Sequence, residues 1–197
     1  MREIIIDIET NSTATHIWCA VTKELKNKEI NVWTDPVKLA TYLEQESVLI
    51  GHNIIGFDVP VLKKHWMMNL DKHQLKDTLV MSRLLNPILE NGHSLRSWGK
   101  RLGNYKDDFK DFDGGLTEEM VSYCKQDVSV TEALYKRLSN DLLDWGDAVS
   151  IEHQVAIAVK EQEENGFKLN VKKAVFLLVD WRKRLAEIEE ELQTVFR

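Results

Sequence analysis

The sequence predicts an α/β fold in which helices flank a mixed sheet and a helical extension follows at the C-terminus. Short Ile- and Val-rich runs separated by polar turns fill the N-terminal part, and apolar residues at helical spacing dominate the rest. Strands in front and helices behind indicate a sheet covered by helices. The length of 197 residues suits one domain of about 150 residues with an appendage. We expect a domain over residues 1–146 and the extension over 147–197.

The predicted strands come first along the chain. Residues Arg2–Glu9, His16–Thr22 and Glu29–Trp33 form an expected antiparallel meander, and Ser47–Gly51 is a short apolar strand. These runs supply the sheet.

The predicted helices have recognisable ends. Asp35 and Pro36 are typical of an N-cap and a first helical residue. The residues from 104 to 115 are charged and glycine-bearing, which indicates a surface loop. Helices are expected from Asp35, after Phe57, over Asp77–Leu85, over His93–Leu102 and over Thr117–Leu142.

The extension is predicted to hold two helices, Ser150–Glu164 and Val171 to the end, with a break at Gly166. The last helix carries apolar residues with heptad spacing, which demands a partner helix. Pairing the two helices as a hairpin would still leave one side short of cover. The heptad residues are Ala174, Leu178, Trp181, Leu185, Ile188, Leu192 and Val195.

Composition narrows the function classes. The net charge of −6 argues mildly against a nucleic-acid partner, because nucleic acid is itself negatively charged. Carboxylates that hold cations weaken this argument, since they bind phosphate through the metal. We expect no membrane partner, because no apolar run approaches the roughly 20 residues that span a bilayer. No signal-like segment opens the chain, and Cys19 and Cys124 are expected to be free thiols in a reducing compartment.

Two acids occur on the first predicted strand. Side chains alternate faces along a strand, so Asp7 and Glu9 project together, opposite Ile4, Ile6 and Ile8. Their carboxylates can share one cation. The alternative is a strand end that has reached solvent.

A second pair of polar residues interrupts the long predicted helix. Tyr123 and Asp127 are one turn apart in a row that is otherwise apolar. A phenol beside a carboxylate can orient a water molecule for attack. A solvated aspartate at the edge of the row is the alternative.

Asp58 and Asp77 stand where helices begin, and both have the simpler explanation of an N-cap. The histidines at 52, 65, 73, 93 and 153 share no ligand spacing, which argues against a zinc site. A set made of carboxylates favours Mg²⁺ or Mn²⁺.

In order and spacing, these residues resemble the tyrosine branch of the DEDD-type 3′–5′ exonucleases, which have a ribonuclease-H-like fold. Asp7 to Thr10 matches Asp-x-Glu-Thr, Asn53 to Asp58 matches Asn-x-x-x-[Phe/Tyr]-Asp, and Tyr123 to Asp127 matches Tyr-x-x-x-Asp. Three further segments are similar to the proofreading domain of phage-type family A DNA polymerases: Asp77–Leu79, His93–Gly103 and Tyr105–Phe109. Ile151–Phe167 resembles the segment that opens the polymerase half, and the last helix would begin the thumb.

The resemblance implies hydrolysis of single-stranded DNA 3′ ends to nucleoside monophosphates with two divalent cations, Mg²⁺ or Mn²⁺. Asp7, Glu9 and Asp127 would hold one metal, and Asp7 would bridge to a second that Asp58 contacts largely through water. Tyr123 would position the attacking water. All five are thus expected catalytic residues. Position relative to the motifs suggests four substrate-binding residues: Thr10, Asn53, Phe57 and Leu95.

The implied partner is a family A-type DNA polymerase, either the remainder of the same chain or a separate subunit. No palm or fingers segment falls within the 197 residues, so we expect no nucleotide addition by this chain. We expect it in the cytoplasm, that of a bacterial host if a phage encodes it. The alternatives are a 3′–5′ exoribonuclease of the same superfamily and a non-catalytic module that docks a polymerase.

Overall fold

A computed structural model describes residues 1–104 and 109–196 of the chain. It divides into two compact units, Met1–Lys160 and Glu161–Arg197. Part of the loop expected over residues 104–115 lies outside the described residues, as do four residues of the 105–109 match. No helix in the described ranges is long and apolar enough to cross a bilayer.

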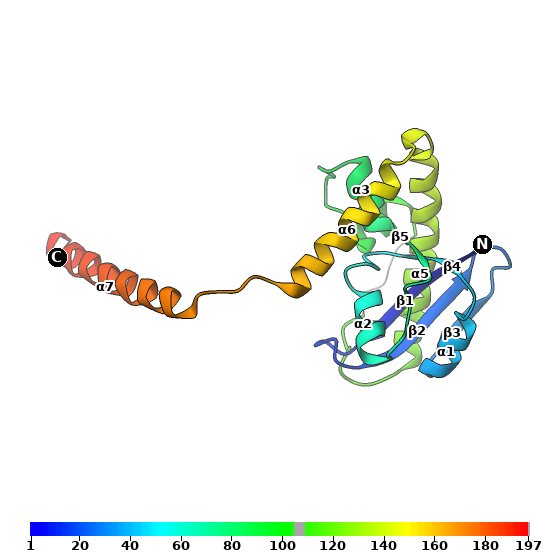
Figure 1. Ribbon diagram of the computed structural model, residues 1–197, viewed down its shortest axis with the longest axis horizontal. Helices are drawn as coiled ribbons and strands as arrows, with labels where there is room; N and C mark the ends of the chain where they lie inside the picture. The colour runs from blue at the N-terminus through cyan, green and yellow to red at the C-terminus, as the bar shows by residue number, and fades with distance from the viewer. Residues whose placement is uncertain (105–108, 197) are drawn as a thin grey trace. The chain divides into compact units, whose positions relative to one another are not determined.

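The first unit is built on a mixed sheet of five strands in the order β3-β2-β1-β4-β5 (Figure 1). β1 pairs antiparallel with β2 and parallel with β4, which in turn pairs parallel with β5. The predicted mixed sheet is therefore confirmed. The strands are β1 (Arg2–Thr10), β2 (Ile17–Glu24), β3 (Ile30–Trp33), β4 (Ser47–Gly51) and β5 (Gln74–Asp77).

The helices begin close to where the sequence predicts them. Asp35 caps the first helix by accepting from the Val37 N–H at 2.9 Å, and Asp77 caps the third by accepting from Leu79 N–H at the same distance. The helices are α1 (Pro36–Tyr42), α2 (Asp58–His65), α3 (Thr78–Leu85), α4 (Leu95–Arg101), α5 (Glu118–Asp141), the short 3-10 helix η1 (Leu143–Trp145), α6 (Ala148–Asn165) and α7 (Val171–Val195).

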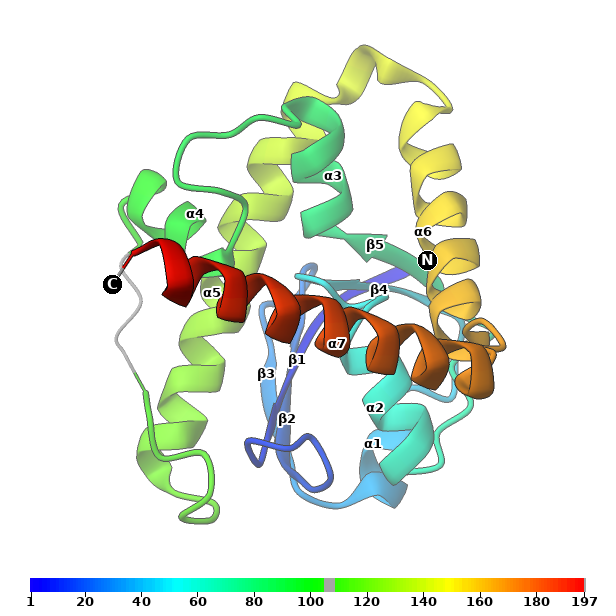
Figure 2. The same ribbon diagram turned by 90° about the vertical axis from the view of Figure 1, so that its left-hand side faces the viewer.

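The sheet has a hydrophobic cluster on each face. One cluster contains Ile4, Ile6 and Ile8 of β1 and packs against α1 and α2. The other contains Ile5 of β1 with Cys124 and Val128 of α5. Figure 2 shows α5 on one side of the sheet and α1 with α2 on the other. The alternation predicted for β1 is confirmed, so the side of β1 that carries Asp7 and Glu9 faces α5.

A third cluster joins α3, α4 and α5 beyond the edge of the sheet. Met81, Leu95 and Val130 are buried there together with Leu134, Leu138 and Leu142. This cluster packs α3 and α4 against α5. It thereby holds the start of α3 next to β4 and β5.

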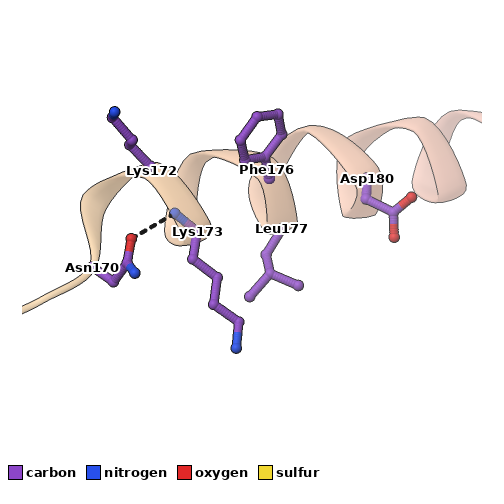
Figure 3. Close-up of a pocket in the computed structure, with 6 residues that line it drawn as sticks. All are labelled: Asn170, Lys172, Lys173, Phe176, Leu177 and Asp180. Carbon is purple, nitrogen blue, oxygen red and sulfur yellow. Dashed lines mark hydrogen bonds between the residues drawn. The ribbon is translucent and has the colours of Figure 1, made fainter.

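The second unit consists mainly of α7. Most apolar residues of its heptad row are exposed, for example Trp181 at 68% and Leu185 at 56% of their surface, whereas Ala174 is partly buried. An open hollow on its first turns is lined by Asn170, Lys172, Lys173, Phe176, Leu177 and Asp180 (Figure 3). All six belong to α7 or its N-cap, so this hollow is a helix surface and not an enclosed site.

Candidate active site

Asp7 and Glu9 lie near the carboxyl end of β1, on the face covered by α5. They pair with Val21 and Cys19 of β2, and the register shifts between Glu9 and Thr10. Glu9 is only 5% exposed and Asp7 is partly buried. The two acids are therefore not at a solvated strand end, and their burial must be compensated.

α5 brings Asp127 to the same place. Cys124 and Val128 of this helix pack on the β1 face of the sheet, and Asp127 between them is 5% exposed. Tyr123, one turn earlier, is partly buried. Asp127 is thus not the solvated edge residue that the sequence also allowed.

Asp58 reaches the cluster from the connection between β4 and α2. The N-cap of α2 is Phe57, no side chain caps this helix, and Asp58 is its first residue with 4% of its surface exposed. Its carboxylate accepts from the backbone of Ile8, where β1 continues past the end of β4. The simple explanation of Asp58 as an N-cap is wrong, because its side chain turns towards β1.

The four carboxylates influence one another strongly. The pKa of Asp7 is raised well above its usual range, first by burial and then by the charges of Asp127, Asp58 and Glu9. Burial also raises the pKa of Asp58 to about 7, and the charges of Asp77 and Asp127 act in the same direction, against hydrogen bonds from its own backbone and from Ile8 that lower it. Acids that repel one another in this way form a site of unfavourable negative charge.

Cys124 is a neighbour that sequence reasoning missed. Its Sγ lies 3.3 Å from Asp7 Oδ2, and ligand atoms of Asp7, Glu9 and Cys124 fall within 4.8 Å of one another. Burial raises the pKa of the Cys124 thiol well above its usual value, and the hydrogen bond with Cys19 and the charges of Asp7 and Glu9 act in the same direction. The protonated thiol donates to Asp7, so the donors available to a cation are carboxylate oxygens.

This set of donors fits a hard divalent cation. Mg²⁺ and Mn²⁺ prefer carboxylate oxygens, and a cation among the acids would remove their mutual repulsion. Among the described residues, no histidine joins the group of Asp7, Glu9 and Cys124. Asp7 and Glu9 are the core of the site, with Asp127 and Asp58 close enough to act on the charge of Asp7.

Two aromatic rings lie beside Tyr123. Its ring centroid lies 5.6 Å from that of Phe109 and 6.2 Å from that of Phe112. The Trp18 indole N–H donates to the Phe112 carbonyl at 2.8 Å. This contact joins residues 94 positions apart, and no local pattern predicts it.

A second tie holds the same loop to the sheet. The Ser12 N–H and hydroxyl both donate to Asp113 Oδ1 at 3.0 Å. The loop after residue 108 is therefore attached to the β1–β2 hairpin and confines the tyrosine ring.

The four predicted substrate-binding residues lie in different surroundings. Thr10 is buried and its hydroxyl donates to the Asn11 carbonyl. Asn53 and Phe57 are exposed in the connection before Asp58. Leu95 is buried in the α3–α5 cluster, where packing alone accounts for it. Their substrate contacts remain a prediction.

The mixed sheet and its flanking helices form a ribonuclease-H-like fold. A family model described as a 3′–5′ exonuclease, of the DNA polymerase A type, matches residues 1–143. The chain belongs to this 3′–5′ exonuclease family. The matched range includes all four carboxylates and Tyr123.

Among known sequences, the chain is similar to two phage DNA-directed DNA polymerases. It is 30% identical to that of Escherichia phage T7 and 28% identical to that of Enterobacteria phage T3. Both alignments cover 98% of this chain and 37% of the polymerase. The chain thus spans little more than a third of the length of these relatives.

Solved structures support the same fold. Brucella melitensis NrnC with bound Mg²⁺ superposes with a TM-score of 0.61 at 18% identity, over 83% of this chain and 86% of that one. Trypanosoma brucei RNase D superposes with a TM-score of 0.54 at 15% identity, over 81% and 64%. At these identities the likeness concerns the fold.

Proposed function

We propose that this chain removes nucleotides from the 3′ end of single-stranded DNA and proofreads for a family A-type DNA polymerase. The observation that carries the proposal is the group formed by Asp7, Glu9, Asp58 and Asp127, where burial and then the charges of the other three acids raise the pKa of Asp7. The similarity to two phage DNA polymerases over 98% of the chain supports DNA as the substrate.

The acids would hold two divalent cations, Mg²⁺ or Mn²⁺. Asp7, Glu9 and Asp127 would hold one, and Asp7 would share the second with the substrate phosphate while Asp58 acts largely through water. Bound cations lower the pKa of water and stabilise charge on the entering and leaving oxygens of the displacement. The thiol of Cys124 keeps Asp7 oriented through its hydrogen bond to Oδ2.

Tyr123 would orient the attacking water. The rings of Phe109 and Phe112 limit where the phenol can move. Asn53, Phe57 and Thr10 would contact the terminal nucleotide, and Leu95 would pack near the last bases. Stacking and backbone contacts of this kind tolerate any base, as proofreading requires.

The polymerase partner would be the rest of the same chain or a separate subunit, in the cytoplasm of a bacterial host if a phage encodes it. The exposed apolar row of α7 supports an attachment role for this helix, because apolar side chains that lie exposed side by side favour contact with a partner. The proposed role includes no nucleotide addition by the 197 residues themselves.

The test is release of mononucleotides from 3′-labelled oligonucleotides in the presence of Mg²⁺. Wild-type protein should degrade single-stranded and mismatched-primer DNA, EDTA should stop the reaction, and Asp7→Asn should be inactive while its circular dichroism is unchanged. Full activity of Asp7→Asn would contradict the assignment.

Parallel RNA oligonucleotides separate the main alternative, a 3′–5′ exoribonuclease. Preferential degradation of RNA would show that the substrate is RNA, and the assignment of the catalytic residues would be unchanged. Calorimetric titration with Mn²⁺ separates the other alternative, a non-catalytic docking module, which requires that the wild-type protein bind no Mn²⁺ and cleave neither substrate.

A further inference from the structure

The segment that carries Asp58 to the site is short and tightly folded. It runs over residues 52–57, between β4 and α2, and is here called the β4–α2 loop. Asn53 has a left-handed backbone conformation with φ of 63°. A Cβ atom at Gly51 would lie 2.7 Å from Ile54 Cβ, and one at Gly56 would lie 2.5 Å from Asn53 Oδ1. A loop folded this tightly needs contacts that hold its shape, since left-handed residues are costly.

Those contacts come from the junction of β5 and α3. Asp77 Oδ1 accepts from the Asn53 N–H at 2.8 Å, and Oδ2 accepts from the Ile55 N–H at 3.1 Å. The next residue, Thr78, donates its hydroxyl to the Gly51 carbonyl at 3.2 Å and lies 2.9 Å from His52 Nδ1. The start of α3 thus holds the first part of the loop through contacts with His52, Asn53 and Ile55.

Asp77 serves the loop beyond its role as a helix cap. Its carboxylate accepts from the Leu79 N–H as the cap requires, and its two contacts with the loop are additional. Burial raises the pKa of Asp77, while the hydrogen bonds from Ile55, Leu79 and Asn53 lower it. The side chain is 1% exposed. A carboxylate buried with three N–H donors is an anchor for the backbone that supplies them.

The backbone of Asp77 is itself held by α6. The Asp77 N–H donates to His153 Nε2 at 2.7 Å, so Nε2 carries no proton. His153 Nδ1 lies 2.6 Å from the Val149 carbonyl, which can only accept, so Nδ1 carries the proton. The ring is 5% exposed, and burial lowers the pKa of His153. Figures 1 and 2 show α6 passing beside β5, where this contact is made.

We propose that Asp77 and His153 are positioning residues of the exonuclease site, which fix the β4–α2 loop so that Asp58 is held against β1. The chain of contacts runs from α6 through His153 to Asp77, and from Asp77 to the loop that ends at Asp58. This inference rests on the proposed role of Asp58 in holding a cation. His153 lies outside the range 1–143 that the family model matches, so α6 contributes to a site that the matched region contains.

The test compares variants that keep or remove each acceptor in the full chain. His153→Gln keeps an acceptor near the position of Nε2, whereas His153→Leu removes it at similar volume. Asp77→Asn keeps a good N-cap for α3 but loses one of the two oxygens that hold the loop. The measurements are kcat, KM for a single-stranded oligonucleotide, and the Mg²⁺ concentration that gives half-maximal activity.

We expect Asp77→Asn and His153→Leu to lower kcat and raise the required Mg²⁺ concentration about 10-fold or more, as loss of a residue that orients a metal ligand does. The KM for the oligonucleotide should rise as well, because Asn53 and Phe57, which would contact the terminal nucleotide, lie in the same loop. His153→Gln should restore these values to within about twofold of wild type, because the acceptor that orients the loop is retained.

Two matched controls separate positioning from general stability. Asp35→Asn alters the equivalent cap of α1, and His73→Leu removes another buried histidine, whose Nδ1 lies 2.9 Å from Ser47 Oγ. Both should keep the wild-type Mg²⁺ requirement even where the melting temperature falls. If His153→Leu does not fold, the Mg²⁺ requirement of Asp77→Asn alone tests the positioning role.

The outcomes that overturn the two proposals differ. A wild-type Mg²⁺ requirement in Asp77→Asn and in every folded His153 variant, beside an inactive Asp58→Ala, would refute the positioning role. An Asp58→Ala protein with full activity would instead refute the proposed site.

Discussion

Two buried acids on α5, Asp127 and Glu132, are five residues apart and have different charged neighbours among the described residues. Glu132 lies 2.6 to 2.8 Å from the amino groups of Lys23, Lys28 and Lys136. Burial alone would raise its pKa, but the hydrogen bonds from these lysines lower it to about 2. Asp127 instead joins Asp7, Asp58 and Glu9, and its charge helps to raise the pKa of Asp7.

The difference distinguishes a structural acid from a site acid. A structural carboxylate obtains its counter-charge from the chain itself, and it stabilises the fold. Site carboxylates that repel one another weaken the fold until a cation enters. Four predictions test this contrast.

The largest effect is expected on catalysis. Asp127→Asn should lower the rate of mononucleotide release at least about 100-fold, because loss of a metal ligand removes several kcal/mol of transition-state stabilisation. The matched variant Glu132→Gln should stay within about twofold of wild type, since its partners are lysines remote from the reaction. Equal losses of rate in the two variants would show that Asp127 and Glu132 do not differ in their role in catalysis.

The second prediction concerns pH and stability without metal. A raised pKa of about 7 for Asp58 means that the folded state binds a proton more tightly than the unfolded state. The free energy of unfolding should therefore fall as pH rises from about 4 to about 7, and level off above that. Relative to Asp58→Asn, wild type should lose a few kcal/mol over this range.

Urea unfolding in EDTA measures this difference, and saturating Mg²⁺ should remove most of it. A difference between wild type and Asp58→Asn that is constant from pH 4.5 to 8 would show that Asp58 has an ordinary carboxyl environment.

The third prediction has the opposite sign. The lowered pKa of Glu132 contributes stability that is complete above about 4.5 and is lost as pH falls towards about 2. Glu132→Gln should cost about 1–2 kcal/mol at pH 7, a value reduced by solvent screening because Lys28 and Lys136 are more than half exposed. The cost should shrink on acidification and at high salt. Denaturant unfolding at pH 3, 5 and 7 provides the check.

The smallest effect is expected at Cys124. Cys124→Ala removes the thiol that donates to Asp7 Oδ2, and a net hydrogen bond of about 1 kcal/mol corresponds to about fivefold in rate. Cys124→Ser keeps a donor and should retain most of the activity. Identical rates for the alanine and serine variants would indicate that the contact does not orient Asp7.

The sequence was sufficient for the elements with strong periodicity. Alternation along β1 placed Asp7 and Glu9 opposite Ile6, and helical spacing placed Asp127 on the buried row of α5. β5 was not predicted, because three of its four residues, Gln74–Asp77, are polar and its pairing with β4 is parallel and non-local. Local pattern cannot reveal a strand that exists only because a distant strand pairs with it.

The site shows the same limit. The motifs named the acids and the tyrosine, but not the contact of Cys124 with a residue 117 positions away. Asp77 was recognised as a cap, which it is, while its bonds to Asn53 and Ile55 depend on the approach of two connections far apart in sequence. Residues that orient a site through the fold are invisible to spacing.

The continuity of α6 governs how this exonuclease could be exchanged between proteins. The first compact unit ends at Lys160, inside a helix that runs from Ala148 to Asn165. A gene fusion joined after residue 143 would discard His153 and leave the buried Asp77 N–H without its acceptor. A junction after Lys160 would carry the whole unit but would fall in mid-helix. Each residue inserted there would turn the remaining residues of α6, up to Asn165, by about 100° about the helix axis.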